Sequence, residues 1–178
     1  MITNAVAIVN IFSGPMPNTA QHWLATNFPE GRAFLSSKDV PLAAARNTMV
    51  RDAIGLLKDE AVEWAWFLDN DVTLTYPGIE RFQEVPGDVV SCDCAMPTGA
   101  GAWEAEDAFH DHFWRCSRKV LLTIPLPWFR DNLSDDGCDL IGCDCSTFRQ
   151  KALDFGFRVR HGGWCGHGCK QSWKGYHA

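Results

Sequence analysis

The sequence predicts an α/β fold, and two observations carry this prediction. Short apolar runs, at residues 5–11 and, without a break, at 64–68, are typical of strands that are buried on both faces. The segment 41–57, which precedes the second run, repeats its apolar residues with a period of 3.6 and therefore indicates an amphipathic helix. A helix that leads into a buried strand belongs to a strand–helix–strand unit, from which parallel sheets are built.

The rest of the chain continues this alternation. Further elements are predicted, in chain order, as a helix over 18–28, strands over 33–35 and 88–94, a short helix over 79–82, strands over 118–124 and 139–143, a helix over 146–156 and a strand over 157–160. Residues 95–113 show no period, and an irregular stretch of that length in a compact domain is usually a functional loop. No repeat or linker divides the chain, so we expect one domain over residues 1–178.

Composition limits the functional classes. The chain has 22 acidic and 16 basic residues and a formal net charge of −6, which argues against a general nucleic-acid binder. No stretch has the length of a membrane span, and no signal peptide is visible. We therefore expect a cytoplasmic protein.

Two carboxylates, Asp69 and Asp71, follow the apolar run at 64–68, with one asparagine between them. In open α/β sheets, ligands bind where strands emerge into their loops. Two carboxylates this close repel each other unless a cation lies between them, and a hard divalent ion is the usual solution. The alternative interpretation is an ordinary turn, in which Asp and Asn are common.

Arg46 falls inside the apolar stripe of the helix predicted over 41–57, and Asn47 lies at the margin of that stripe. A charge on an apolar stripe is costly unless it is paired or faces a polar ligand. The alternative is an arginine at the edge of the core whose stem packs on apolar residues while its charged end reaches water.

The eight cysteines include three close pairs, Cys92 with Cys94, Cys143 with Cys145, and Cys165 with Cys169. Without a secretion signal a disulfide framework is not expected, and the C-x-x-C spacing of zinc knuckles is absent. Buried thiols are the favoured interpretation. A structural or interaction module that binds zinc through these pairs, together with His161 or His167, is an alternative function.

The order of these features resembles the nucleotide-sugar glycosyltransferases of the GT-A fold, especially short, family 2-like bacterial and phage members. The matching residues are Ala45, Arg46 and Asn47, the segment 67–71, and Ile141, Gly142 and Cys143 with Phe148 and Arg149. The motifs are short, but together they cover most of the chain in order. The resemblance implies a GT-A-like three-layer sandwich with a mainly parallel central sheet.

The resemblance also implies a ligand set. Asp69 and Asp71 would hold Mn²⁺ or Mg²⁺, which bridges the two phosphates of a nucleotide-sugar and stabilises the charge on the leaving diphosphate. Residues implied to contact this donor are Asn10, Asp39, Arg46, Asn47 and Asp69. The acceptor is open, and a glycan, a protein and modified DNA all fit. A nucleotide-sugar-binding relic without turnover is a further alternative.

One feature departs from the family. In members of the family, a late helix begins with an acidic pair that supplies the catalytic base or a metal ligand. In this sequence, Gly166 and His167 occupy the matching position. Histidine ligates Mn²⁺ and acts as a base near neutral pH, so His167 is predicted as a metal ligand and a catalytic residue.

Family members also have a metal-binding histidine further along the chain. Either His177 takes that role here, or the C-terminal part of the fold is missing from this sequence. Asp144 is predicted as the catalytic carboxylate, with Asp139, Glu104 and Glu106 as other candidates. Trp103, Trp114, Trp128 and Trp164 are candidates for the flat faces on which sugars or bases stack, although most of the tryptophans are expected in the core.

Overall fold

The computed structural model describes residues 4–10, 16–28, 33–36, 42–57, 62–74, 79–94, 109, 112–130, 132–133, 140–142 and 144–167. For some of these the backbone alone is described, among them Asn10, Asp144 and His167.

The centre of the molecule is a seven-stranded sheet with the order β2-β1-β3-β6-β5-β9-β4. Its strands are β1 Ala5–Asn10, β2 Ala33–Ser36, β3 Trp64–Asp69, β4 Val72–Thr73, β5 Val89–Cys94, β6 Phe113–Ser117 and β9 Val159–His167. The pairs β1–β2, β1–β3 and β5–β9 are parallel, whereas β3–β6, β5–β6 and β4–β9 are antiparallel. The expected α/β class is confirmed, and the sheet is mixed rather than predominantly parallel.

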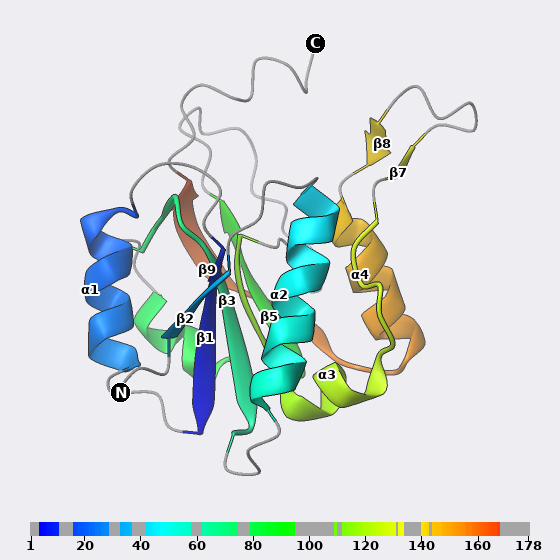
Figure 1. Cartoon of the computed structure of the whole chain (residues 1–178), viewed down its shortest axis with the longest axis horizontal. Helices are drawn as coiled ribbons and strands as arrows, with labels where there is room; N and C mark the ends of the chain where they lie inside the picture. The colour runs from blue at the N-terminus through cyan, green and yellow to red at the C-terminus, as the bar shows by residue number, and fades with distance from the viewer. Residues whose placement is uncertain are drawn as a thin grey trace.

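Helices cover both faces of this sheet, which gives three layers (Figure 1). On one face lie α1 Asn18–Asn27 and the 3₁₀ helix η1 Ile79–Glu84; on the other lie α2 Leu42–Leu56, α3 Arg118–Thr123 and α4 Asp144–Asp154. A separate two-stranded ribbon pairs β7 Asn132–Leu133 with β8 Leu140–Gly142. Among the described residues, no helix has the length and apolar character needed to cross a membrane.

The apolar runs are explained by strands that are buried on both faces. In β1, Val6 and Ile8 pack into the core beneath α2, whereas Ala5, Ala7 and Val9 join the core that includes α1. Successive side chains of a strand point to opposite faces, so a strand between two helical layers is apolar at every position.

The strand predicted over 118–124 is wrong, because these residues form α3. Ser117 caps this helix, since its Oγ accepts a hydrogen bond from the Val120 N–H at 3.4 Å. Val120, Leu121 and Ile124 are buried, which is a helical spacing. The strand lies just before, as β6, and the sequence interpretation missed it.

The strand predicted over 157–160 is wrong in extent, because β9 runs from Val159 to His167. Its register against β5 shifts between Ser91 and Cys92, and Gly163 there has a φ of 137°. Glycine takes such a backbone conformation without strain. The segment 161–167, which contains three glycines, therefore belongs to a strand of the sheet.

Candidate functional site

The acidic pair lies at the edge of the sheet where the parallel strands β1 and β3 end. Asp69 is the last residue of β3, and Asn70 and Asp71 form the turn into β4. These three side chains are buried, with exposed fractions of 2% for Asp69, 1% for Asn70 and 8% for Asp71. The burial of two carboxylates at one strand end is more than a solvated turn requires.

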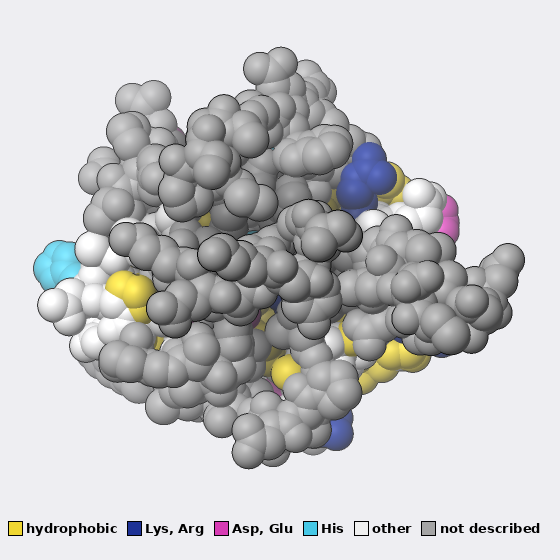
Figure 2. Space-filling model, turned by 90° about the horizontal axis from the view of Figure 1, so that it is seen from above, with side chains coloured by type: hydrophobic (Ala, Val, Ile, Leu, Met, Phe, Trp, Pro, Cys, Tyr) yellow, Lys and Arg dark blue, Asp and Glu magenta, His cyan; other side chains and the backbone are white. Residues whose placement is uncertain are grey.

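Figure 2 looks onto this edge of the molecule. The charged side chains of the described residues are scattered over it and do not gather into one patch. The low exposure of Asp69, Asn70 and Asp71 shows that the polar cluster around Asp69 is buried.

Arg46 of α2 reaches this cluster from the neighbouring helical layer. Its Nη2 lies 3.5 Å from Asp69 Oδ2, and both side chains are buried. The arginine therefore does not extend to water at the edge of the core; its charge is paired with an acid at the end of β3. Removing one partner of such a buried pair typically costs several kcal/mol, because the other charge stays buried.

His112 is a member of the cluster that the sequence interpretation missed. Its Nδ1 lies 3.1 Å from Asp69 Oδ2, and its backbone carbonyl accepts a hydrogen bond from the Asp69 N–H at 2.8 Å. The residue directly precedes β6, which runs antiparallel to β3, so the start of β6 meets the end of β3. Had β6 been predicted as a strand that pairs with β3, His112 would have been identified as a neighbour of Asp69.

The backbone of His167 comes to the same edge by strand pairing. In the ladder between β4 and β9, His167 is the register partner of Val72, the residue after Asp71. Asn10 is likewise the register partner of Asp69 on β1. Their side chains are not described, so both residues stay predictions as ligands, with a backbone position that suits them.

Asn47 has a different environment from Arg46. Its Oδ1 accepts hydrogen bonds from the backbone N–H groups of Trp128 at 2.7 Å and Phe129 at 3.1 Å, and its Nδ2 donates to the Phe129 carbonyl at 2.8 Å. The amide therefore fastens the segment after α3 to α2. Its contact with a donor stays a prediction.

Of the other residues predicted for the site, some lie in described parts of the chain and some lie outside them. Asp144 is the first residue of α4, which begins two residues before the predicted start, and its side chain is not described. Asp39 and His177, like Asp139, Glu104, Glu106 and Trp103, lie outside the described residues. Trp114 and Trp128 are core residues, as expected for most tryptophans. The Trp164 side chain is not described.

The described cysteines are split between the two faces of the sheet. Cys92 and Cys165 are buried thiols in the core that includes α1, and Cys116 is a buried thiol in the core beneath α2. Cys145, in the latter core, is disulfide-bonded, so the expectation of a buried thiol is wrong for this residue. The side chain of its partner is not described. These four cysteines therefore cannot share one zinc ion.

The chemistry of the acidic pair fits a hard divalent cation. Carboxylate oxygens are preferred by Mg²⁺ and Mn²⁺, which need few protein ligands because phosphates and water complete their coordination. Among the described residues, no group of three His, Cys, Asp or Glu side chains is arranged to hold a metal. The cation would therefore be held by Asp69 and Asp71 with ligands from a bound substrate or from residues that are not described.

The sequence matches no protein-family model and no curated protein. Among solved structures, the chain is similar to A197 from STIV, with a TM-score of 0.58 and 18% identity over 89% of this chain and 81% of that chain. At this identity the similarity shows a shared fold alone.

Two more distant similarities are to a glycosyltransferase and to a nucleoside-diphosphate-sugar pyrophosphorylase. A glycosyltransferase involved in the glycosylation of the major capsid of PBCV-1 aligns with a TM-score of 0.48 and 12% identity over 94% of each chain. A nucleoside-diphosphate-sugar pyrophosphorylase from Vibrio cholerae RC9 aligns with a TM-score of 0.38 and 10% identity over 89% of this chain and 72% of that chain. Scores this low carry no argument about function.

Proposed function

We propose that this protein is a glycosyltransferase that uses a divalent cation and a nucleotide-sugar donor. The observation that carries the proposal is the buried pair Asp69 and Asp71 at the end of β3, with the Arg46 guanidinium 3.5 Å from Asp69. Two carboxylates and a guanidinium, taken out of water at a strand end, form the polar set that a metal-bound diphosphate needs.

The charges of the site define what each residue would do. Mn²⁺ or Mg²⁺, when bound, supplies positive charge that stabilises the departing nucleoside diphosphate. Asp69 and Asp71 would hold the cation, and Arg46, already at this edge, would contact a phosphate oxygen of the donor. Burial strengthens these electrostatic interactions because little water competes for the charges.

His112 would act as a positioning residue. Its ring and Arg46 both contact Oδ2 of Asp69, which restricts the orientation of that carboxylate before a ligand arrives. His167 and Asp144 would be the candidates for the base that accepts the proton of the acceptor. The acceptor itself is a hydroxyl-bearing molecule of undefined class: a glycan, a protein or modified DNA.

The test is release of nucleoside diphosphate from a panel of nucleotide-sugars, with water or added sugars as acceptor. We expect turnover with Mn²⁺ or Mg²⁺ and none in excess EDTA. Asp71→Asn should lower it by about 100-fold or more, as expected for the loss of a metal ligand. This variant leaves the Arg46–Asp69 pair in place, so the protein should stay folded.

Asp52→Asn is the matched control, because Asp52 is an exposed aspartate on α2 beside Arg51. It should retain full activity. Metal-dependent binding of a nucleotide-sugar without release of nucleoside diphosphate from any donor would favour the alternative of a nucleotide-sugar-binding protein without turnover. Zinc retained at one equivalent through purification, without donor binding, would favour the zinc module and contradict the proposal.

A further inference from the structure

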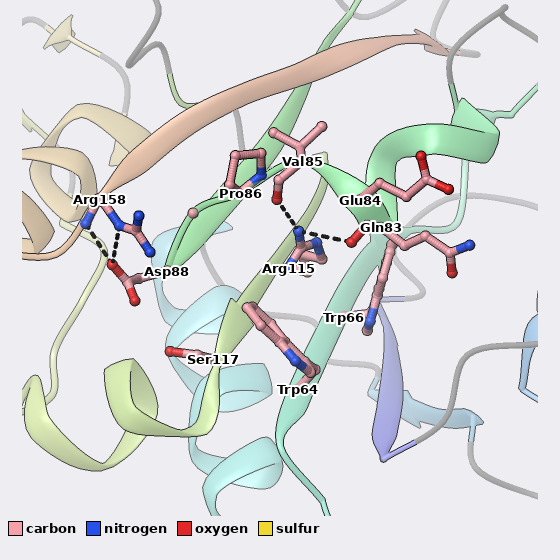
Figure 3. Close-up of a pocket in the computed structure, with 11 residues that line it drawn as sticks. Trp64, Trp66, Gln83, Glu84, Val85, Pro86, Asp88, Arg115, Ser117 and Arg158 are labelled. Atoms are coloured by element: carbon pink, nitrogen blue, oxygen red, sulfur yellow. Dashed lines mark hydrogen bonds and ion pairs between the residues drawn. The ribbon is translucent and has the colours of Figure 1, made fainter.

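A second polar site lies at the opposite edge of the sheet. A hollow of about 550 Å³ is bordered by Trp64, Trp66, Val85 and Arg115, with Asp88 and Arg158 at its rim (Figure 3). Trp64 begins β3 and Asp69 ends it, so the part of the hollow at Trp64 is roughly 16 Å along the strand from Asp69, and the part at Trp66 roughly 10 Å, at about 3.3 Å per residue. A volume of this size accommodates a small organic ligand.

The distinctive group of the hollow is the guanidinium of Arg115. This residue lies in the middle of β6, yet only 4% of it is exposed. Its guanidinium lies over the ring of Trp64, with the guanidinium carbon 4.3 Å from the ring centroid. Nη2 donates to the carbonyls of Val85 at 2.6 Å and Gln83 at 3.3 Å.

These contacts leave the charge of Arg115 without a carboxylate. Among the described residues no acid forms an ion pair with it, and its Nε–H has no acceptor. Burial lowers the pKa of Arg115 from its ordinary value to about 10, and Cys116 opposes this lowering in part. A buried cation that is balanced only by carbonyl dipoles and a π face is costly, and an anion would relieve that cost.

The charges at the rim leave Arg115 available to an anion. Asp88 Oδ2 lies 3.4 Å from Arg158 Nε and also accepts a hydrogen bond from the Arg158 N–H at 2.9 Å, so these two opposite charges offset each other. Glu84 is exposed, and Figure 3 shows its carboxylate turned away from Arg115. Its repulsion of an anion is weakened by water.

We propose that this hollow binds a small organic anion, a carboxylate or a phosphate monoester that carries a flat ring. The anionic group bonds to the Arg115 guanidinium, and the ring packs against the half-buried indole of Trp64. Charge-assisted hydrogen bonds to a guanidinium are among the strongest in proteins, and the Trp64 indole gives the ring an apolar surface. The site is independent of the proposed transferase centre at the other edge of the sheet.

Nitrogen-15 NMR tests this site directly. The indole N–H signals of Trp64 and Trp66 are assigned from the Trp64→Phe and Trp66→Phe variants and followed during titration with benzoate, phenyl phosphate, acetate and inorganic phosphate. We expect saturable shifts at millimolar concentration with benzoate or phenyl phosphate, and weaker binding of the two anions without a ring. Whichever of benzoate and phenyl phosphate binds more tightly identifies the anionic group.

Three variants make the test specific. Arg115→Gln should weaken binding by about tenfold or more, and Arg115→Lys serves the same purpose where the glutamine variant does not fold. Glu84→Gln should tighten binding by about two- to threefold, because it removes a repelling charge. Arg51→Gln, which removes an exposed charge on α2, should leave binding unchanged.

The proposal is overturned by either of two results. One is the absence of saturable shifts with any of the four anions. The other is binding that a folded Arg115→Gln or Arg115→Lys protein retains at full strength.

Discussion

Asn47 provides the sharpest test of what the polar residues on the inner side of α2 do, because its side-chain amide makes three hydrogen bonds to the backbone of a distant segment. Two are accepted from the N–H groups of Trp128 and Phe129, and one is donated to the Phe129 carbonyl, at distances of 2.7, 3.1 and 2.8 Å. Trp128 and Phe129 are both buried. This geometry gives Asn47 a structural task that is separate from any contact with a donor.

The expected cost of removing this amide follows from those bonds. Each contributes about 1 kcal/mol net, so Asn47→Ala should lower the free energy of unfolding by about 3 kcal/mol. Asn47→Asp keeps an acceptor for both N–H groups but loses the donor and sets a carboxylate oxygen against the Phe129 carbonyl. It should cost about 1–2 kcal/mol.

Urea denaturation at 25 °C measures both values against a matched control. Asn27→Ala removes a single half-buried hydrogen bond, from Nδ2 to the Trp23 carbonyl at 2.9 Å, and should cost about 1 kcal/mol. An Asn47→Ala protein no less stable than Asn27→Ala would refute the structural role. Loss of donor binding at unchanged stability would instead support the contact with a nucleotide-sugar predicted from the sequence.

Three further predictions concern packing and protonation. Gly162→Ala should lower the free energy of unfolding by about 1–3 kcal/mol, because the new methyl group would overlap the Phe82 ring. Gly55→Ala, in open space on α2, should instead raise it by about 0.5–1 kcal/mol, and chemical denaturation measures both values. Phe148→Ala should cost about 3–5 kcal/mol in the same assay, because this fully buried ring stacks on a neighbouring indole with a centroid distance of 4.6 Å. Burial raises the pKa of the Cys116 thiol well above 9.0, although the neighbouring Arg115 guanidinium opposes this shift. Above pH 9 the thiol therefore loses its proton when the protein unfolds, so the free energy of unfolding should fall by about 1.4 kcal/mol per pH unit more than in Cys116→Ala. Equal pH slopes for the two proteins would contradict this.

The parts of the fold that sequence analysis predicted are those in which the pattern is local. Residues 5–9 of the first strand and residues 64–68 before Asp69 are all apolar because both faces of these strands are covered, and α2 keeps a 3.6 period because one stripe faces the sheet. Arg46 broke that stripe, and the conflict correctly marked a polar contact with Asp69. A local rule broken at a costly position is informative because the fold must compensate for it.

The elements that were missed depend on contacts far apart in the sequence. Strand β6 contains Arg115, which interrupts an apolar pattern. Among the described residues, the rings of Trp64, Trp66 and Phe82 and the carbonyls of Gln83 and Val85 offset the cost of its burial. Strand β9 contains glycines of low strand propensity, yet Gly162 is required by the close approach of Phe82. Neither reason is visible in a window of neighbouring residues.

The antiparallel strands also explain why His112 was overlooked while Asp69 was found. The rule that ligands bind beyond the carboxyl ends of strands directs attention to residues that follow a strand, as Asp69 and Asp71 do. An antiparallel neighbour reverses this order, because its first residue lies beside the last residue of its partner. Strand β6 thus presents the residue that precedes it, His112, to the carboxylate that ends β3. In a mixed sheet, candidate residues must therefore be sought before the antiparallel strands as well as after the parallel ones.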